Sequence, residues 1–453
     1  MEYNEEQTLL LGKEKPSILL HRYAFPAIIA MIASSAYNII DSAFIGHGVG
    51  AMAISGITLT FPFMNLAGAF GTLVGVGGAT ILSIKLGEGD YKTARLVLGN
   101  VVILNSLIGI LFTALTLPFL TSILGFFGGT EKTIPYAFDY MKWILCCNIF
   151  THIYFGLNAM LRSCGLPRLA MGITIGSVVL NIPLAWLFIY PCGWGIEGAA
   201  IATCIAQITA TIVQVLVFFK RDKIVYFSKN IFKLRFTIVK QIFAIGMSPF
   251  LINTAACVVV ILINAAFLRF GGDYAIGAYG IVNRVAFIFV MVCFGFMQGM
   301  QPIVSYNFGA KQYDRMWATW RLTIKYTTIV MTFAFILCEI IPYQIASIFT
   351  TDSEMIKQAA QGFRYVMIFF PIIGYQTVST NFFQSTGKAK KSIFLSLTRQ
   401  VVFLIPLVLI LPIFWGVIGV WLSLPLSDLL STIITYFLIK REKKLSVYQQ
   451  NNI

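Results

Sequence analysis

The sequence has very few charged side chains for its length. Of 453 residues, only 11% are Asp, Glu, Lys or Arg, whereas 58% are hydrophobic. Soluble globular proteins carry about 25% charged and about 45–50% apolar residues. So little charge does not cover a water-facing surface of ordinary size. The composition therefore excludes that the chain as a whole is a soluble enzyme, a nucleic-acid-binding protein or a disordered protein.

Metal ligands and long polar segments are also scarce. The three histidines, His21, His47 and His152, lie far apart, and the eight cysteines contain no CxxC pair. A zinc-type ligand cluster is therefore not expected. The longest polar connection, about 220–236, is too short for a separate soluble domain, and no Walker motif occurs. We expect a protein that is not an enzyme, holds no cofactor and takes its energy from an ion gradient or from the solute.

Long apolar runs fill most of the chain instead. A membrane-spanning helix needs about 20 apolar residues. Twelve runs reach this length, and they do not alternate in polarity as the strands of a membrane barrel would. They cover roughly residues 17–45, 53–84, 94–120, 134–161, 168–190, 198–219, 238–268, 275–306, 318–345, 356–384, 392–411 and 417–439. The sequence predicts an all-α polytopic membrane protein with twelve transmembrane helices.

Most of the basic residues lie in alternate connections between these runs. With the N-terminus placed in the cytoplasm, 24 Lys and Arg fall on the cytoplasmic side, against only Lys132 and Arg269 outside. Cytoplasmic loops of membrane proteins carry such an excess of Lys and Arg. We therefore predict a multi-pass protein with both termini in the cytoplasm.

The chain also repeats itself at a shift of about 222 residues. Pro26 meets Pro249, Gly165 meets Gly387 and Trp194 meets Trp415, with the loops between them in step. Chance similarity between apolar helices would not keep these positions in register. We predict two homologous six-helix lobes around a central cavity, residues 1–222 and 237–453, joined by a cytoplasmic linker at 223–236. Such parallel repeats are typical of transporters that work by alternating access.

The repeats differ at one acidic residue. Asp41 lies in the first run, in SSAYNIIDSAF, and its counterpart in the second repeat is Asn264. A charged side chain inside a span costs about 2.5–3.5 kcal/mol on insertion scales, and folds that keep one usually use it. Asp41 is therefore a candidate to exchange a proton, or to bind sodium together with neutral oxygens.

Neutral polar side chains are available in the same repeat. Each of them alone could be a hydrogen bond between helices, but together, beside the acid, they favour a binding site. Thr203 and Gln207 share one helix face because they lie four residues apart. The candidates are Tyr37, Asn158, Asn181, Thr203 and Gln207.

Four further charges are expected at membrane depth. Arg284 and Arg399 could pair with Glu339 or Asp428, and the spacing in the sequence does not choose between the pairings.

Several motifs in both halves resemble one family of transporters. They are FPAII, YNIIDSAFIG, GVGGATILSIKLGEGDYKTAR, LNAMLRSCGLPR, LNIPLAWLFIYPCGWGIEGAAIATCIAQ, QGMQPIVSYNFGAK and NFFQSTGKAKKS. In this order, over roughly residues 12–440, they are similar to the multidrug and toxic compound extrusion (MATE) family, in its DinF-like bacterial branch. The resemblance implies a bacterial inner-membrane protein that exports amphipathic, often cationic compounds in exchange for protons or sodium.

The resemblance also implies site residues. The cation site of this branch matches Asp41, Asn181 and Thr203, and positions lining that site or its drug pocket match Tyr37, Tyr140 and Asn158. The family's second Asp, one turn after the Asn, is replaced by Ala185. A sodium ion would lose a carboxylate ligand there, so proton coupling at Asp41 is favoured over sodium at Asp41, Asn181 and Thr203.

A second function remains open at this point. A flippase of the same superfamily, acting on lipid-linked saccharides, would need a cationic cavity for a pyrophosphate group. For either function we expect a small drug-like or lipid-linked substrate, membrane lipids as surroundings, no nucleic acid and a monomeric chain.

Overall fold

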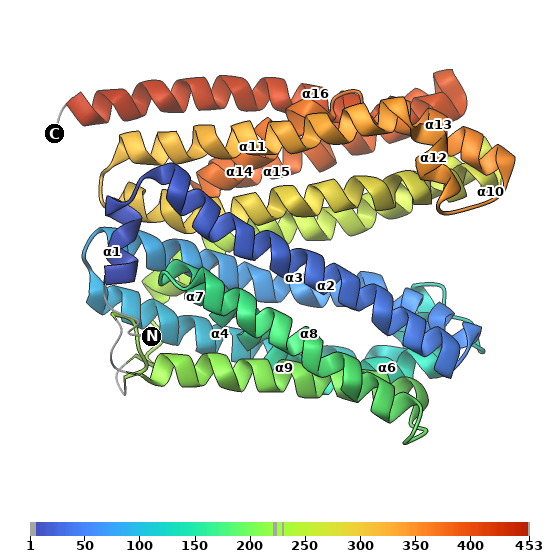
Figure 1. Ribbon diagram of the computed structural model, residues 1–453, viewed down its shortest axis with the longest axis horizontal. Helices are drawn as coiled ribbons and strands as arrows, with labels where there is room; N and C mark the ends of the chain where they lie inside the picture. Colours follow the sequence, from blue (N-terminus) through green and yellow to red (C-terminus); the bar gives the residue numbers. More distant parts are fainter. Residues whose placement is uncertain (1–5, 221–223, 229–230, 452–453) are drawn as a thin grey trace. The chain divides into compact units, whose positions relative to one another are not determined.

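The computed structural model describes residues 6–220, 224–228 and 231–451. Within these residues every regular element is a helix, and no strand is found (Figure 1). The long elements follow the predicted apolar runs, since such runs satisfy their backbone hydrogen bonds internally only as helices in lipid. The elements are α1 (Glu6–Lys13), α2 (Pro16–Gly48), α3 (Ala51–Gly87), α4 (Tyr91–Thr116), η1 (Leu117–Phe119), α5 (Leu120–Phe126), α6 (Ile134–Cys146), α7 (Asn148–Ser163), α8 (Pro167–Ile189), α9 (Gly195–Phe219), α10 (Phe236–Gly309), α11 (Tyr313–Ile340), α12 (Pro342–Ser347), α13 (Ser353–Met367), α14 (Phe370–Ser385), α15 (Ala389–Leu397), the π-helical segment η2 (Thr398–Leu404) and α16 (Ile405–Asn451).

The number of spans agrees with the twelve expected from the sequence. In the described part of the chain, eight continuous helical stretches are long and apolar enough to cross a membrane. Two bent pairs, α6 with α7 at 56° and α13 with α14 at 52°, bring the number to ten. Gly272 in α10 and Gly416 in α16 then divide two of the stretches, because their φ angles of 69° and 56° break the helix. Only glycine adopts such angles readily.

The helices form two compact units. Unit 1 contains the described residues of Met1–Glu14 and Ile29–Phe250, and unit 2 those of Lys15–Ile28 and Leu251–Ile453. The first helix of each repeat therefore begins in one unit and continues in the other. Both changes of unit fall within two residues of a proline, after Pro26 in α2 and after Pro249 in α10. The lobe boundaries expected from the sequence, 1–222 and 237–453, stay a prediction.

Residues 15–28 belong to unit 2 and residues 236–250 to unit 1, so each repeat gives a segment to the other unit. Glycines allow these exchanged segments to pack closely. In unit 1, a Cβ on Gly246 of α10 would overlap the carbonyl oxygen of Leu73 in α3, and one on Gly77 would overlap that of Ile242. In unit 2, a Cβ on Gly299 would lie 2.6 Å from the backbone nitrogen of Ala24 in α2. Small residues permit this approach of helix backbones. Each exchanged segment thus lies directly against the second helix of the opposite repeat.

The connection between the repeats packs on unit 1. Arg95 of α4 donates to the carbonyl oxygen of Ile224 at 2.8 Å and stacks over the ring of Tyr226. Asn100 donates to the Lys233 carbonyl oxygen at 3.1 Å and accepts from the Arg235 backbone nitrogen at 3.0 Å. Of the predicted linker at 223–236, residues 223, 229 and 230 lie outside the described residues. The described remainder is bound to the end of α4.

Each unit has its own apolar core. In unit 1, α3 packs against α4 and α7, while α9 packs against α8, α7 and α6 (Figure 1). In unit 2, α14 packs against α11 and α16, and the rings of Phe267 and Trp421 meet in the core at 4.5 Å, tilted by 59°. The candidate site residues of the sequence all belong to unit 1.

Candidate ion and substrate site

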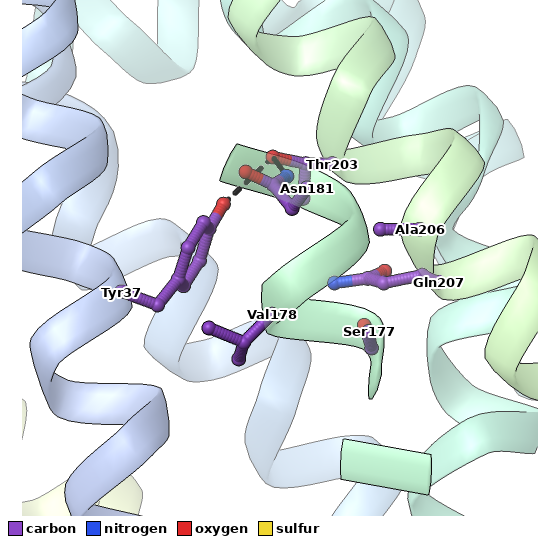
Figure 2. A pocket seen from close by; sticks show the side chains of 7 residues that line it. All are labelled: Tyr37, Ser177, Val178, Asn181, Thr203, Ala206 and Gln207. Carbon is purple, nitrogen blue, oxygen red and sulfur yellow. Dashed lines mark hydrogen bonds between the residues drawn. The ribbon is translucent and has the colours of Figure 1, made fainter. Parts of the chain in front are cut away.

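Thr203 joins three helices of unit 1 through its hydroxyl group. The Thr203 hydroxyl donates to the Ala199 carbonyl oxygen at 3.1 Å within α9. Having used its only hydrogen there, it accepts from the Tyr37 hydroxyl of α2 at 2.7 Å and from the Asn181 amide of α8 at 3.1 Å (Figure 2). The pocket-lining residues Tyr37 and Asn181 therefore meet at the Thr203 hydroxyl. The sequence predicted these three residues as neighbours, and the structure brings them together.

A small pocket opens beside this network. Its volume is about 40 Å³, more than the ~10–15 Å³ that one water molecule requires. Figure 2 shows Tyr37 on one side and Gln207 on the other. The lining residues are Tyr37, Ser177, Val178, Asn181, Thr203, Ala206 and Gln207. None of them is charged, so the pocket offers hydroxyl and amide groups to water, a cation or a small polar group.

Asp41 lies one helical turn after Tyr37 on α2. Its side chain is 7% exposed, and no hydrogen-bond partner of its buried Oδ1 atom is found among the described residues. A buried acceptor without a partner costs about 1–3 kcal/mol, and more when the group is charged. Asp41 interacts electrostatically with Tyr37 and with Tyr140 of α6. The geometry therefore suits a carboxyl group that takes up a proton or a cation beside the Tyr37–Thr203–Asn181 network.

Tyr140 and Ala185 belong to the apolar cluster around this part of unit 1. Tyr140 is 3% exposed and Ala185 is 1% exposed, and both pack in one core cluster with Ala199. The place of the family's second acid is thus filled by a buried methyl group. No group of three or more His, Cys, Asp or Glu able to hold a metal ion occurs in the described part of the chain. A sodium ion would have Asp41 as its carboxylate ligand together with neutral oxygens.

The remaining two candidates have different surroundings. Gln207 lines the pocket, and its Oε1 accepts from the Thr151 hydroxyl of α7, which leaves its amide nitrogen toward the pocket side. Asn158 is not among the lining residues. It donates to the Ala170 carbonyl oxygen at 3.3 Å and to Thr174 at 3.2 Å, and it accepts from Arg162. Its role in substrate binding stays a prediction.

Ser177, Val178 and Ala206 line the pocket and were not among the sequence candidates. Helical spacing was the signal that could have found them, because Ser177 lies four residues before Asn181 and Ala206 three residues after Thr203. Residues at these separations share a helix face. Their small or apolar side chains carried no chemical signal of their own.

Two ion pairs lie in the described part of unit 2 among the charged residues of its spans. Arg399 Nε lies 2.5 Å from Asp428 Oδ1, and Arg364 Nε lies 3.9 Å from Glu339. This decides the pairing that the sequence left open for Arg399. It also gives Glu339 a partner that the sequence did not suggest.

The chain as a whole is similar to several known proteins. The family model MatE matches residues 26–187 and 241–410. Multidrug export protein MepA of Staphylococcus haemolyticus (strain JCSC1435) is 27% identical over 435 residues, which cover 96% of both chains. A solved structure of the MATE multidrug transporter DinF-BH, in complex with a ligand, is 36% identical, with a TM-score of 0.87 over 94% of this chain and 95% of that one.

A second solved structure supports the fold alone. It is an outward-facing multidrug resistance MATE family transporter of the MOP superfamily, 21% identical, with a TM-score of 0.92 over 98% of this chain and 99% of that one. The predicted architecture of twelve helices in two lobes is confirmed by this likeness. Because the family model matches both repeats across more than half of the chain, this protein belongs to the MATE family.

Proposed function

We propose that this protein exports amphipathic, often cationic compounds across a bacterial plasma membrane in exchange for protons. The relatives named above are a multidrug export protein and a multidrug transporter. The observation that carries the proposal is the buried, unpartnered carboxyl of Asp41 beside an uncharged polar pocket in the described part of unit 1. A carboxyl group held in this way can bind either a proton or an organic cation, and the two would compete for it.

Competition at Asp41 is the coupling step of the proposal. With the site open to the cytoplasm, the ionised carboxylate attracts the cationic compound, and the Tyr37 and Asn181 oxygens offer further acceptors. With the site open to the outside, a proton taken up by Asp41 removes that attraction and the compound leaves. The two homologous repeats supply two states by alternating access, and the Lys and Arg distribution supports cytoplasmic termini.

Protons are favoured over sodium because Ala185 contributes no ligand. Sodium coordination in proteins relies on several oxygen ligands, and the buried methyl group of Ala185 stands where the family has a carboxylate. The lipid-linked saccharide flippase finds less support, since the seven residues lining the pocket include no Lys or Arg to bind a pyrophosphate. We further propose that a single chain carries out transport.

Transport in proteoliposomes tests the proposal. Purified protein is reconstituted, a proton or sodium gradient is imposed, and the uptake of a fluorescent lipophilic cation into inside-out vesicles is followed. We expect a proton gradient to drive uptake in the wild type, and Asp41→Asn to reduce it at least ~10-fold, which corresponds to about 1.4 kcal/mol or more.

Glu131→Gln is the matched control, because Glu131 is an exposed acid of unit 1 outside the site. It should transport like the wild type. Full gradient-driven transport by Asp41→Asn would overturn the coupling role of Asp41. If neither gradient moved any cation in the wild type, the export function itself would be wrong, and lipid-linked substrates would be tested next.

A further inference from the structure

The two repeats remain in register through the pocket of unit 1. Ser177 and Arg399 each lie twelve residues after the matched glycines Gly165 and Gly387. In the same way, Val178 corresponds to Gln400. Counting from the matched tryptophans Trp194 and Trp415, Gln207 and Asp428 each lie thirteen residues later. Three residues that line the pocket of unit 1 thus correspond to Arg399, Gln400 and Asp428 in unit 2.

An ion pair occupies these positions in unit 2. Arg399 Nε lies 2.5 Å from Asp428 Oδ1, and the side chains are 30% and 8% exposed. Gln400 Oε1 is buried, and no hydrogen-bond partner is found for it in the described part of the chain. The Arg399–Asp428 contact joins η2 to the part of α16 after Gly416, as the Asn181–Thr203 hydrogen bond joins α8 to α9 in unit 1. Unit 2 therefore holds a carboxylate, an amide oxygen and a guanidinium where unit 1 has neutral groups.

A one-residue insertion accompanies this change. The sequence Ile-Pro-Leu begins seventeen residues after Gly165 but eighteen residues after Gly387. The extra residue lies between Gly387 and Ile405, a stretch that contains the π-helical segment η2, Thr398–Leu404, with both Arg399 and Gln400. Single-turn π-helices of this kind occur often at functional sites. The insertion identifies η2 as the place where the second repeat departs from the first.

The polar network of unit 1 has apolar counterparts. Leu424 corresponds to Thr203, since both lie nine residues after the matched tryptophans, and Leu424 packs against the apolar core of unit 2. Val260 corresponds to Tyr37, by the register that matches Asp41 with Asn264. Asn264 corresponds to Asp41, so among the described positions of unit 2 that match the site of unit 1, the carboxylate is that of Asp428.

We propose that Arg399 acts as a built-in cation that fills a second carboxylate site at Asp428 and so restricts cationic cargo to unit 1. The inference rests on the proposed function, since it concerns where a cationic compound binds. A guanidinium is always charged and its planar fork matches a carboxylate. Being tethered within the same unit, it is present at a high effective concentration, so a free cation would have to displace it. Arg399 would thereby determine that one repeat, and not both, loads cargo.

Binding stoichiometry tests this role. The full chain is purified in detergent, and the binding of tetraphenylphosphonium, a lipophilic cation, is measured by equilibrium dialysis. We expect Arg399→Gln to bind one more cation per chain than the wild type, because the Asp428 carboxylate then has lost its guanidinium partner. The double variant Arg399→Gln/Asp428→Asn should return to the wild-type number, and Arg399→Lys should keep that number because it retains the charge.

The result that would overturn the proposal is an unchanged number of bound cations in Arg399→Gln together with unchanged affinity at the first site. A wild type that binds no cation would instead contradict the proposed function. A second measurement serves if Arg399→Gln is too unstable for dialysis. Methylguanidinium should raise the unfolding temperature of Arg399→Ala by more than it raises that of Arg399→Ala/Asp428→Ala. Equal shifts in the two variants would also overturn the proposal.

Discussion

The pocket of unit 1 and its counterpart in unit 2 show how two copies of one fold diverge in chemistry. In unit 1, Tyr37, Asn181 and Thr203 form a neutral network next to a pocket, with Asp41 nearby and no partner for its Oδ1 among the described residues. In unit 2, Arg399 of a π-helical segment pairs with Asp428. The unit 1 network joins the first, fifth and sixth spans of its repeat, whereas the ion pair of unit 2 joins the fifth and sixth. The two repeats therefore share one backbone fold but carry their charged residues at different positions, and the following predictions test that view.

The helix crossing of unit 1 should show the largest effect. A Cβ on Gly246 would overlap the Leu73 carbonyl oxygen, and backbone atoms have little room to move. We expect Gly246→Ala to lower the stability of the fold by more than about 3 kcal/mol, above the usual cost of overpacking, because the overlap is with backbone. Thermal unfolding in detergent measures this, with Gly68→Ala as control because no atom lies within 4 Å of a Cβ at Gly68.

The equivalent crossing in unit 2 sharpens this prediction. There Ala24 of α2 meets Gly299 of α10, and Ala24 already carries a Cβ at the contact. Ala24→Gly should therefore change the unfolding temperature far less than Gly246→Ala. Equal effects of Gly246→Ala and Gly68→Ala would show that the crossing is not under steric constraint.

The ion pair of unit 2 comes next. Removing one partner of a buried pair costs about 3–5 kcal/mol, whereas replacing both partners with apolar residues is often nearly neutral. Arg399 is partly exposed, so we expect Asp428→Ala to fall at the lower end of this range. The double variant Arg399→Met/Asp428→Leu should unfold close to the wild-type temperature. A double variant as unstable as the single one would mean that the charges themselves stabilise unit 2.

Thr203 offers a smaller test in unit 1. Its hydroxyl accepts from Tyr37 and Asn181, and each such hydrogen bond contributes about 0.5–1.5 kcal/mol. We expect Thr203→Val to reduce proton-driven transport roughly 3- to 10-fold, because losing these hydrogen bonds removes about 1 kcal/mol that holds the site in place. Thr209→Val is the control, because the Thr209 hydroxyl is exposed and bonds only to the Ile205 carbonyl oxygen among the described residues. Wild-type transport by Thr203→Val would remove the network from the mechanism.

The smallest effect concerns a helix cap that only one repeat has in the described part of the chain. Asp90 accepts from the Thr93 backbone nitrogen at the start of α4. Hydrogen bonding by the Thr93 side chain, together with this backbone hydrogen bond, lowers the pKa of the Asp90 carboxyl below its usual value. The equivalent residue at the start of α11, Gln312, makes no capping hydrogen bond through its side chain. We expect Asp90→Ala to destabilise the protein by about 1 kcal/mol and Gln312→Asp to stabilise it by a similar amount.

The pH dependence of the cap follows from the sign of that shift. Because the folded pKa of Asp90 is lowered, its contribution is complete above the unfolded value of about 3.9 and is lost as the pH falls through the folded value. The difference in unfolding temperature between wild type and Asp90→Ala should therefore be constant from neutral pH down to about pH 5 and shrink below about pH 4. A difference that grew on acidification would contradict this account.

The structure confirms the helical fold expected from the apolar runs, and it does so for a simple physical reason. Lipid offers no hydrogen-bond partners, so a run of about 20 apolar residues has essentially one solution, the helix. The Gly and Pro positions repeated in both halves were equally informative about the register of the repeats. The sequence did not predict that residues 15–28 belong to unit 2 and residues 236–250 to unit 1, because this depends on which helix faces pack together.

The site was partly visible in the sequence. Asp41, Asn181 and Thr203 stood out because polar groups are costly in a span, and Asn181 and Thr203 do meet through a hydrogen bond. Ser177, Val178 and Ala206 did not stand out, since small and apolar side chains are common everywhere in such helices. The environment of Asn158, bonded to Ala170, Thr174 and Arg162, was likewise invisible because the spacing of residues does not reveal side-chain partners.

Composition, periodicity and internal symmetry are enough to predict the membrane-spanning class, the two repeats and the acid at Asp41, whose counterpart in the second repeat is Asn264. The pairing of Arg399 with Asp428, and the contact of Tyr37 and Asn181 with the hydroxyl group of Thr203, became known from the folded structure. Which polar groups satisfy one another depends on helix rotation and crossing, and these are set by close packing between segments far apart in the chain.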